Sequence, residues 1–253
     1  MNARTETPLL AMCAGIYSEQ PAIGVLDKLF RCSWSHTLPD DFQDRMVVVP
    51  DGCSDLIFAG GRLMIVGPDR IAAFPAVAAG ETILGLRFRP GAALRWLDIP
   101  LSELVGHAVP LRDLRHDTQE IEEQLASESS LAERRALLHA WALRKSVATA
   151  DPRSDMEALF NRLSNGMLHD VSAQAAFGER TLRRQSRDHF GYGPKMLQRI
   201  LRFQRFLRLA RRTSPQSLAI LALEAGYADQ AHMTRDVKEF TTLTPLDIRR
   251  QLA

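Results

Sequence analysis

Arginine side chains gather in one stretch of this 253-residue sequence. From Glu179 to Arg212 there are eleven Lys and Arg residues but only two acidic ones. A guanidinium group donates paired hydrogen bonds to phosphate oxygens or to the edge of guanine, so this stretch is typical of a surface that binds nucleic acid. A basic run alone is more often a solvated face, and Arg outnumbers Lys 28 to 4 over the whole chain. The arginines therefore need elements that present them to a groove.

One such element is predicted within residues 222–236, where the chain changes from helix to turn and back to helix. Gly226 tolerates the left-handed backbone that ends a helix, and Asp229 is suited to cap the next one. Apolar residues then recur at helical spacing, at Met233, Val237 and Phe240. The passage predicts a helix-turn-helix with these residues on its outer face: Gln230, Ala231, His232 and Arg235.

A similar unit is predicted about fifty residues earlier, in residues 171–187. A first helix is expected to end near Ala176, with a turn at Phe177 and Gly178. The following helix carries more charge than a core can bury, in Arg180, Arg183, Arg184 and Arg187. Between the two units, the apolar spacing predicts one rigid helix from Pro194 to Ala210.

Residues 155–250 resemble the DNA-binding domain of the AraC/XylS family of bacterial transcription regulators. The resemblance rests on Arg180, Leu182 and Arg184, on Gly191 and Pro194, on Gly226-Tyr227, and on Thr244-Pro245. It implies seven helices with two helix-turn-helix units joined by a long helix, and recognition helices at Thr181–Phe190 and Gln230–Phe240. Some positions depart from the family pattern. Ser186 and Val237 stand for buried phenylalanines, while Ala176 and Thr242 stand for glycines.

Composition and motifs exclude several other classes of protein. No apolar run reaches the length of a membrane span, and residues 1–15 lack the pattern of a signal peptide, so a cytoplasmic protein is expected. The three cysteines show neither disulfide nor zinc spacing, and no metal site or cofactor is expected. Phosphate loops, GxSxG elbows and HExxH helices are absent, so the chain is not expected to be an enzyme with catalytic residues.

The N-terminal part differs from the C-terminal part in charge and in pattern. Residues 1–150 hold 15 basic and 19 acidic side chains, whereas residues 151–253 hold 17 and 11. Short apolar or alternating runs at residues 44–49, 54–59, 62–66 and 82–89 predict a β-barrel or β-sandwich. A helical hairpin is expected over residues 117–126 and 130–147, and a linker over 148–154. The fold class expected is α+β, with domains at residues 1–150 and 151–253.

The N-terminal domain also resembles one found in a branch of the same regulators. The resemblance covers residues 17–114 and rests on the run from Val47 to Phe58, with Pro50-Asp51-Gly52, and on the run from Leu84 to Ala93, with Pro90-Gly91. Such domains sense a ligand or mediate assembly, and their helices often form a dimer interface. The candidate ligand residues are Asp51, Cys53, Asp55 and Arg87, together with Arg89. Turn aspartates and edge-strand arginines also occur with no ligand at all.

These observations predict a sequence-specific transcription regulator that binds double-stranded DNA. Base contacts are expected from Arg180, Arg183 and Arg184, with Thr181 beside them, and from Gln230, Ala231, His232 and Arg235. Phosphate contacts are expected from Arg187, Lys195, Arg202 and Lys238. Further partners implied by the resemblance are RNA polymerase, a small-molecule effector and a second copy of the chain. The alternative is a protein-interaction module whose basic helical domain binds an acidic partner.

Overall fold

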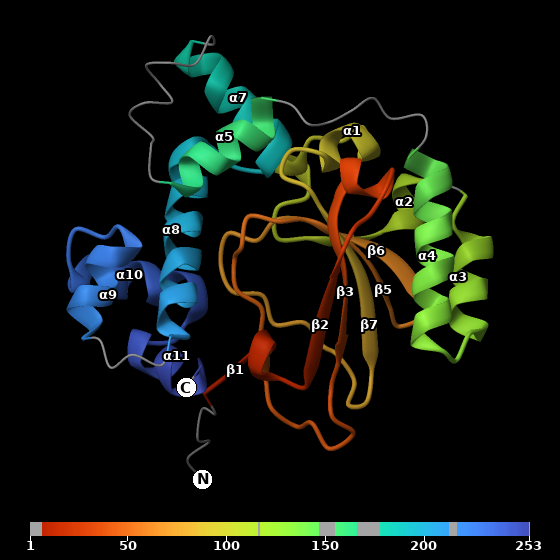
Figure 1. Cartoon of the computed structure of the whole chain (residues 1–253), viewed down its shortest axis with the longest axis horizontal. Coiled ribbons are helices and arrows are strands. Elements are labelled where there is room, and N and C mark those ends of the chain that lie inside the picture. The colour runs from red at the N-terminus through yellow and green to blue at the C-terminus, as the bar shows by residue number, and fades with distance from the viewer. Residues whose placement is uncertain (1–6, 116, 147–154, 166–177, 213–216, 253) are drawn as a thin grey trace.

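The computed structural model describes residues 7–115, 117–146, 155–165, 178–212 and 217–252. A β-sheet lies at the centre, with a pair of helices on one side and the C-terminal helices on the other (Figure 1). The first predicted helix-turn-helix begins with a helix at residues 171–176, and this helix lies outside the described residues, as does the predicted linker at residues 148–154.

The sheet has six antiparallel strands in the order β2-β3-β7-β5-β6-β8. Their bounds are β2 Ile16–Pro21, β3 Phe30–Thr37, β5 Asp55–Ala59, β6 Arg62–Val66, β7 Thr82–Phe88 and β8 Ala108–Pro110. Two shorter strands, β1 Leu9–Leu10 and β4 Met46–Val47, pair in parallel. The strands predicted at 54–59, 62–66 and 82–89 are confirmed. The one predicted at 44–49 is reduced to β4, followed by a bridge from Val48 to Ala73.

The predicted α+β fold class is confirmed, but the sheet is open and does not close into the barrel expected from the sequence. Among the described strands, β2 pairs only with β3 and β8 only with β6. Closing a barrel needs long, staggered strands at both edges, whereas β8 has three residues. Helices cover one face of the sheet instead of a second sheet, and they bury its apolar side chains.

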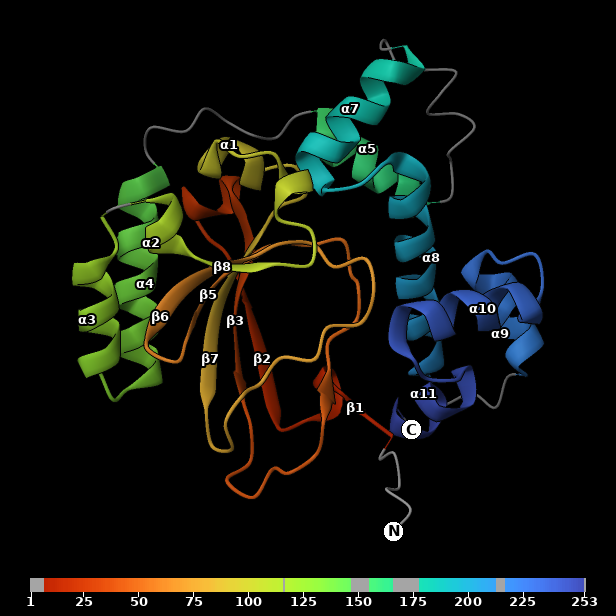
Figure 2. The ribbon, with the colours of Figure 1, turned by 180° about the vertical axis from the view of Figure 1, so that it is seen from behind.

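The predicted helical hairpin is present as α3 Gln119–Ser127 and α4 Leu131–Ser146. Figure 2 shows both helices on the side of the sheet away from the C-terminal domain. Their apolar stripe packs into the sheet core through Ile121, Leu125, Leu138 and Trp141. Because this stripe is buried against the chain's own sheet, it is not free to form a dimer interface. The remaining short helices are η1 Ala11–Cys13, η2 Leu26–Lys28, α1 Ala93–Leu97, η3 Leu101–Glu103 and α2 Leu111–Leu114.

The C-terminal helices follow the sequence prediction closely. They are α5 Asp155–Ser164, α7 Glu179–Phe190, α8 Pro194–Ala210, α9 Leu218–Ala225, α10 Gln230–Thr241 and α11 Pro245–Leu252. Helix α8 has the predicted bounds, with Pro194 at its first turn. In Figures 1 and 2, α7 lies at one end of α8, while α9, α10 and α11 surround its other end.

One hydrophobic cluster, separate from the sheet core, includes residues from both parts of the chain. Leu10, Val47 and Val49 from the N-terminal part are buried in the same cluster as the C-terminal helices. At the chain ends, the Gln251 side chain bonds the backbone of Pro8 and Leu10 at 2.9 and 2.8 Å. The boundary predicted near residue 150 stays a prediction, because the packing runs across it.

Two turns of the N-terminal part dock the C-terminal helices. Pro50 accepts a hydrogen bond from the Gln204 side chain at 2.7 Å, and Gly52 lies against Leu197, Phe160 and Tyr192. In the second turn, Gly91 O lies 3.0 Å from His189 Nδ1. Next to it, Arg89 pairs with Glu157 at 3.0 Å. Both turns have a glycine at positive φ, where an L side chain would be strained. The contacts of these two turns hold the N-terminal part against α5, α7 and α8.

Candidate DNA-binding surface

The second helix-turn-helix consists of α9, a turn and α10. Gly226 ends α9 in the left-handed conformation at φ 91°, and Tyr227 N bonds Ala222 O at 2.9 Å. Asp229 caps α10 by accepting from His232 N at 2.7 Å. Ala222 and Ala225 are fully buried, which lets the two helices approach closely. The turn chemistry predicted from the sequence is therefore confirmed.

Helix α10 has one buried face and one exposed face. Met233, Val237 and Phe240 are fully buried. The opposite face exposes four of the predicted contact residues: Gln230, Ala231, Arg235 and Lys238. His232 is half-buried, with its ring 5.2 Å from that of Tyr227 in an edge-on arrangement.

A buried carboxylate ties α10 to α8. The Asp236 side chain is 5% exposed, and it accepts from Arg199 at 2.8 Å and from Arg202 at 3.3 Å. The guanidinium of Arg202 also lies 4.6 Å from the ring of Tyr227. Arg202 was expected to contact phosphate, but its guanidinium group is paired with Asp236 inside the domain. No local pattern indicates this pairing, because Arg202 and Asp236 lie 34 residues apart.

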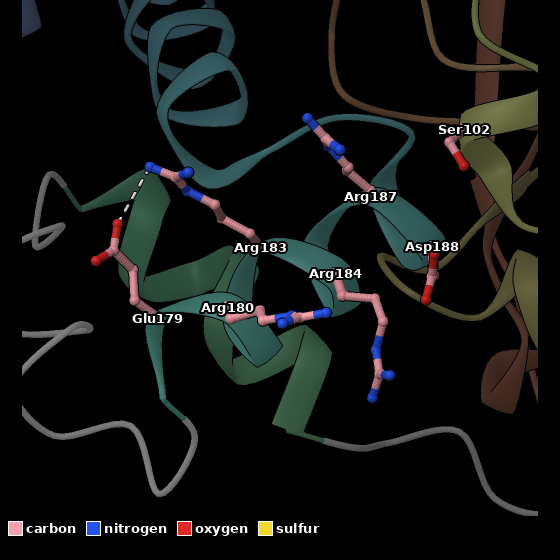
Figure 3. A pocket seen from close by; sticks show the side chains of 7 residues that line it. All are labelled: Ser102, Glu179, Arg180, Arg183, Arg184, Arg187 and Asp188. Atoms are coloured by element: carbon pink, nitrogen blue, oxygen red, sulfur yellow. Dashed lines mark ion pairs between the residues drawn. The ribbon is translucent and has the colours of Figure 1, made fainter.

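The first recognition helix, α7, carries the predicted arginines on its outer side. Leu182, Ser186 and Phe190 are buried beneath it. Four arginines are exposed and line one shallow hollow of about 780 Å³: Arg180, Arg183, Arg184 and Arg187 (Figure 3). Thr181 is half-buried beside them. Only Arg183 of the four forms an ion pair with another described residue, Glu179, at 3.1 Å.

Two departures from the family pattern have visible consequences. Ser186 is fully buried, but its hydroxyl donates to Tyr192 O at 2.7 Å, so its polar group is satisfied. Thr242 adopts φ 65° at the end of α10, where glycine would be unstrained. Ser186 is buried beneath α7 and Thr242 follows the end of α10, so neither residue lies on an exposed recognition face. Ala176 lies outside the described residues.

One residue at the edge of the arginine hollow was missed by sequence reasoning. Ser102, from η3 of the N-terminal part, lines the hollow together with Asp188 of α7 (Figure 3). Next to it, Gly191 packs against Pro68, Val105 and Leu101. No local motif marks Ser102, because its position depends on how the two parts of the chain pack.

Four of the five candidate ligand residues come together: Asp55 and Arg87 on strands β5 and β7, and Asp51 and Cys53 in the loop before β5. Arg87 pairs with Asp55 at 3.2 Å and with Asp51 at 3.4 Å, and Cys53 N donates to Asp51 at 2.8 Å. Two partners were not predicted: Glu19, 3.6 Å from Arg87, and Trp34, whose indole nitrogen donates to Asp55 at 2.9 Å. The related candidate Arg89 instead joins the docking turn. The role of this cluster in ligand binding stays a prediction.

The electrostatics of this cluster are dominated by burial. Burial raises the pKa of the Asp55 carboxyl even though Arg87 lies beside it. Burial by itself would lower the pKa of Arg87, but the carboxylates of Asp55 and Asp51 raise it well above its usual value. Burial also raises the pKa of the Cys53 thiol. Arg87 forms ion pairs with both Asp51 and Asp55. Since Asp51 belongs to the turn at residues 50–52, these ion pairs hold that turn against the sheet.

Asp69 should make stability depend on pH. Burial, together with the charges of Asp51 and Asp55, raises its pKa from 3.8 to about 6. The native state therefore holds this proton more tightly than the unfolded state, and stability should fall as pH rises from about 4 to 6. Asp69→Asn should raise Tm at pH 7 and have less effect at pH 4. The matched control, exposed Asp44→Asn, should show no such difference. Equal Tm changes for Asp69→Asn at both pH values would refute this role.

Comparison with known proteins assigns the C-terminal part. Residues 171–251 match the family model of a helix-turn-helix domain. This part is an AraC-type helix-turn-helix domain. Residues 20–110 match a second model, described as a domain of unknown function (DUF6597). None of the curated proteins compared with the chain matches it.

The comparison with solved structures found partial likenesses to two transcription-related proteins. A probable AraC family transcriptional regulator from Rhodopseudomonas palustris is 16% identical over 37% of this chain and 93% of its own, with a TM-score of 0.34. ToxT from Vibrio cholerae is 10% identical over 94% of this chain and 98% of its own, with a TM-score of 0.46. A ToxT structure described as unsaturated fatty acid bound is also 10% identical, over 87% and 91%, with a TM-score of 0.43. The assignment rests on the match at residues 171–251 and not on these likenesses.

An AraC-type domain behind an N-terminal sheet domain is the architecture of a DNA-binding transcription regulator. The AraC-type regulators are a non-enzymatic family, which agrees with the prediction that the chain is no enzyme. No helix in the described residues is long and apolar enough to cross a membrane. Within the same residues, no group of three or more His, Cys, Asp or Glu side chains is placed to hold a metal ion.

Proposed function

We propose that one copy of this chain regulates transcription by inserting α7 and α10 into two successive major-groove segments of one DNA site. The observation that carries this proposal is the pair of exposed polar faces on α7 and α10, with α8 between them. A helix of 17 residues is about 25 Å long, and it is anchored at both ends by buried side chains. The two recognition helices are therefore held apart by a rigid element.

The exposed side chains suggest different tasks for the two helices. Arg180, Arg183 and Arg184 present guanidinium groups suited to guanine, with Thr181 set deeper. Gln230 suits adenine, and Arg235 extends the second contact surface next to Ala231. His232 can contact DNA only through the part of its ring that is not packed against Tyr227. Because the two sets differ, the preferred site should be asymmetric.

Phosphate contacts are assigned to basic side chains beside these faces. Arg187, Lys195 and Lys238 are exposed and not paired with a described acidic residue, so they are free to neutralise phosphates. Arg202 is removed from this set because Asp236 holds it. Arg202 instead positions α10, and so acts on DNA binding only through α10.

The N-terminal domain is proposed to sense a small molecule or to mediate assembly, and RNA polymerase is a proposed partner of the whole chain. Support for a sensing role comes from the two docking turns. The Arg87 cluster fixes the turn at residues 50–52, and that turn contacts Tyr192 between the two helices α7 and α8. A change at the cluster would reach α7 through this contact. As a regulator of bacterial DNA, the chain would act in the cytoplasm.

The competing function is binding of an acidic protein by the basic helices. The arginine face of α7 fits either partner, because both are negatively charged. DNA binding differs in its dependence on base sequence. A protein partner would compete equally with specific and scrambled duplexes, whereas DNA reading requires a clear preference for one sequence.

Substitution of one residue in each class should separate base reading from phosphate binding. On the duplex that full-length chain selects from random sequence, Arg184→Ala should cost about 1–3 kcal/mol and relax preference at one base position. Lys238→Ala should weaken all sequences alike and reduce the dependence of affinity on salt. Both side chains are exposed, so neither change should alter folding. Base-selective loss at Lys238, or uniform loss at Arg184, would reverse the assignment.

A further inference from the structure

The arginine hollow on α7 extends across the boundary between the two parts of the chain. Most of its lining belongs to α7, but one edge is Ser102 of η3 in the N-terminal part (Figure 3). Ser102 is exposed, so its hydroxyl is open to a ligand in the hollow. Serine hydroxyls commonly donate hydrogen bonds to phosphate oxygens in protein–DNA complexes. The N-terminal part therefore presents a polar donor on the same surface as the first recognition helix.

The contact that places Ser102 beside α7 is close-packed. Gly191 ends α7 at φ 83°, and a Cβ atom at this position would approach the side chains of Pro68 and Val105 to 2.6 and 2.7 Å. It would also come within 3.2 Å of the carbonyl oxygen of Leu101, the buried residue that precedes Ser102. Because close-packed contacts of this kind resist displacement, Ser102 keeps a fixed position relative to α7.

The charge and size of the hollow favour an extended polyanion. Its four arginines outnumber its two carboxylates, those of Glu179 and Asp188. Glu179 already pairs with Arg183 at 3.1 Å, so three guanidinium groups remain against the carboxylate of Asp188. At about 780 Å³ the hollow is far larger than one phosphate group, so it can hold a stretch of sugar–phosphate backbone. A single small anion would leave most of the arginines without a partner.

We propose that the surface that contacts DNA continues from α7 onto η3, where Ser102 donates a hydrogen bond to a phosphate of the DNA backbone. Arg187 shares this phosphate, because it lies in the last turn of α7, next to the contact of Gly191 with η3. The inference rests on the proposed function and extends it, since the N-terminal part then binds DNA directly. Phosphate contacts fix the orientation of a protein on the duplex. Ser102 therefore helps to orient α7 in the groove and specifies no base.

The proposal is tested by changing the charge at position 102 in the full-length chain. Ser102→Arg should raise affinity for the selected duplex at low salt, because a guanidinium group replaces a hydroxyl beside the phosphate. One added phosphate contact should also steepen the slope of log affinity against log salt by about 1. Ser102→Glu should weaken binding to all sequences alike, by about tenfold at low salt, because its carboxylate repels the phosphate. A gain of affinity cannot come from misfolding, so Ser102→Arg tests the contact even if Ser102→Glu lowers stability.

The matched controls are Ser129→Arg and Ser129→Glu. Ser129 is also exposed, but it lies between α3 and α4, on the side of the sheet away from the C-terminal helices (Figure 2). Because these variants change the net charge by the same amount at a distance from the hollow, they should alter affinity and salt slope much less. Equal effects at positions 102 and 129 would overturn the proposal. In the same titrations, the preference of the wild-type chain for the selected duplex over a scrambled one tests the proposed function, so the two proposals can fail separately.

Discussion

Replacing Asp236 by alanine is expected to destabilise the C-terminal domain by about 3 kcal/mol. The carboxylate is 5% exposed and receives hydrogen bonds from Arg199 and Arg202. Removing one partner of a buried ion pair leaves the other charges without compensation, which costs 3–5 kcal/mol in fully buried cases. The guanidinium groups here are 30% and 21% exposed, so water offsets part of the loss.

The matched control is Glu239→Ala. Glu239 also binds Arg199, at 2.6 Å, but its side chain is 47% exposed. Surface ion pairs contribute up to about 1 kcal/mol, so this variant should stay close to wild type. Urea unfolding followed by helical circular dichroism measures both. Equal losses for the two variants would mean that burial of Asp236 is not what makes its ion pairs strong.

The helical domain was predictable because its signals are local. Gly226 and Asp229 mark the end of α9 and the start of α10 within four residues, and both adopt the conformations that their chemistry favours. The bounds of α8 followed from Pro194 and from an apolar stripe with helical spacing. The exposed arginines of α7 were predicted for the same reason, since a helix cannot bury so many charges.

The missed features depend on contacts between distant segments. Arg202 looks like a surface charge in the sequence, and only the fold shows that Asp236 holds it. Ser102 reaches the arginine hollow through packing of η3 on α7. The turns at Pro50 and Pro90 were correctly placed as turns, but their role in docking α8 and α7 has no local signal.

The open sheet shows how an exposed edge weakens the strand signal. Strand β2 is exposed on both faces, so it lacks the alternation of apolar and polar residues by which β5, β6 and β7 were found. Strand β3 buries Ser33, Ser35 and His36, which interrupts its apolar pattern. Without these two strands, the sequence could indicate a sheet but not whether the sheet closes.

Inserting five base pairs between the two halves of the selected DNA site is expected to cause the largest loss of binding. Five base pairs turn one half of the site to the far side of the duplex, because one helical turn takes 10–10.5 base pairs. Helix α8 is a single rigid helix and cannot follow this rotation. Each lost base contact costs about 1–3 kcal/mol, so loss of one recognition helix should reduce affinity at least tenfold.

The full-length chain should be used, because Leu10, Val47 and Val49 belong to the core of the helical domain. The measurement is made at low protein concentration, so that it reports binding by one copy of the chain. A control duplex carries the same five base pairs outside the site and should bind like the original duplex.

The decisive measurement is therefore the affinity of one copy for three duplexes at one salt concentration: the selected site, the site with five inserted base pairs, and the site with one half scrambled. If α7 and α10 read DNA together, the insertion should lower affinity to that of the half-scrambled duplex. If the insertion leaves affinity unchanged, only one of the two helices docks, and reading of two grooves by one chain is contradicted.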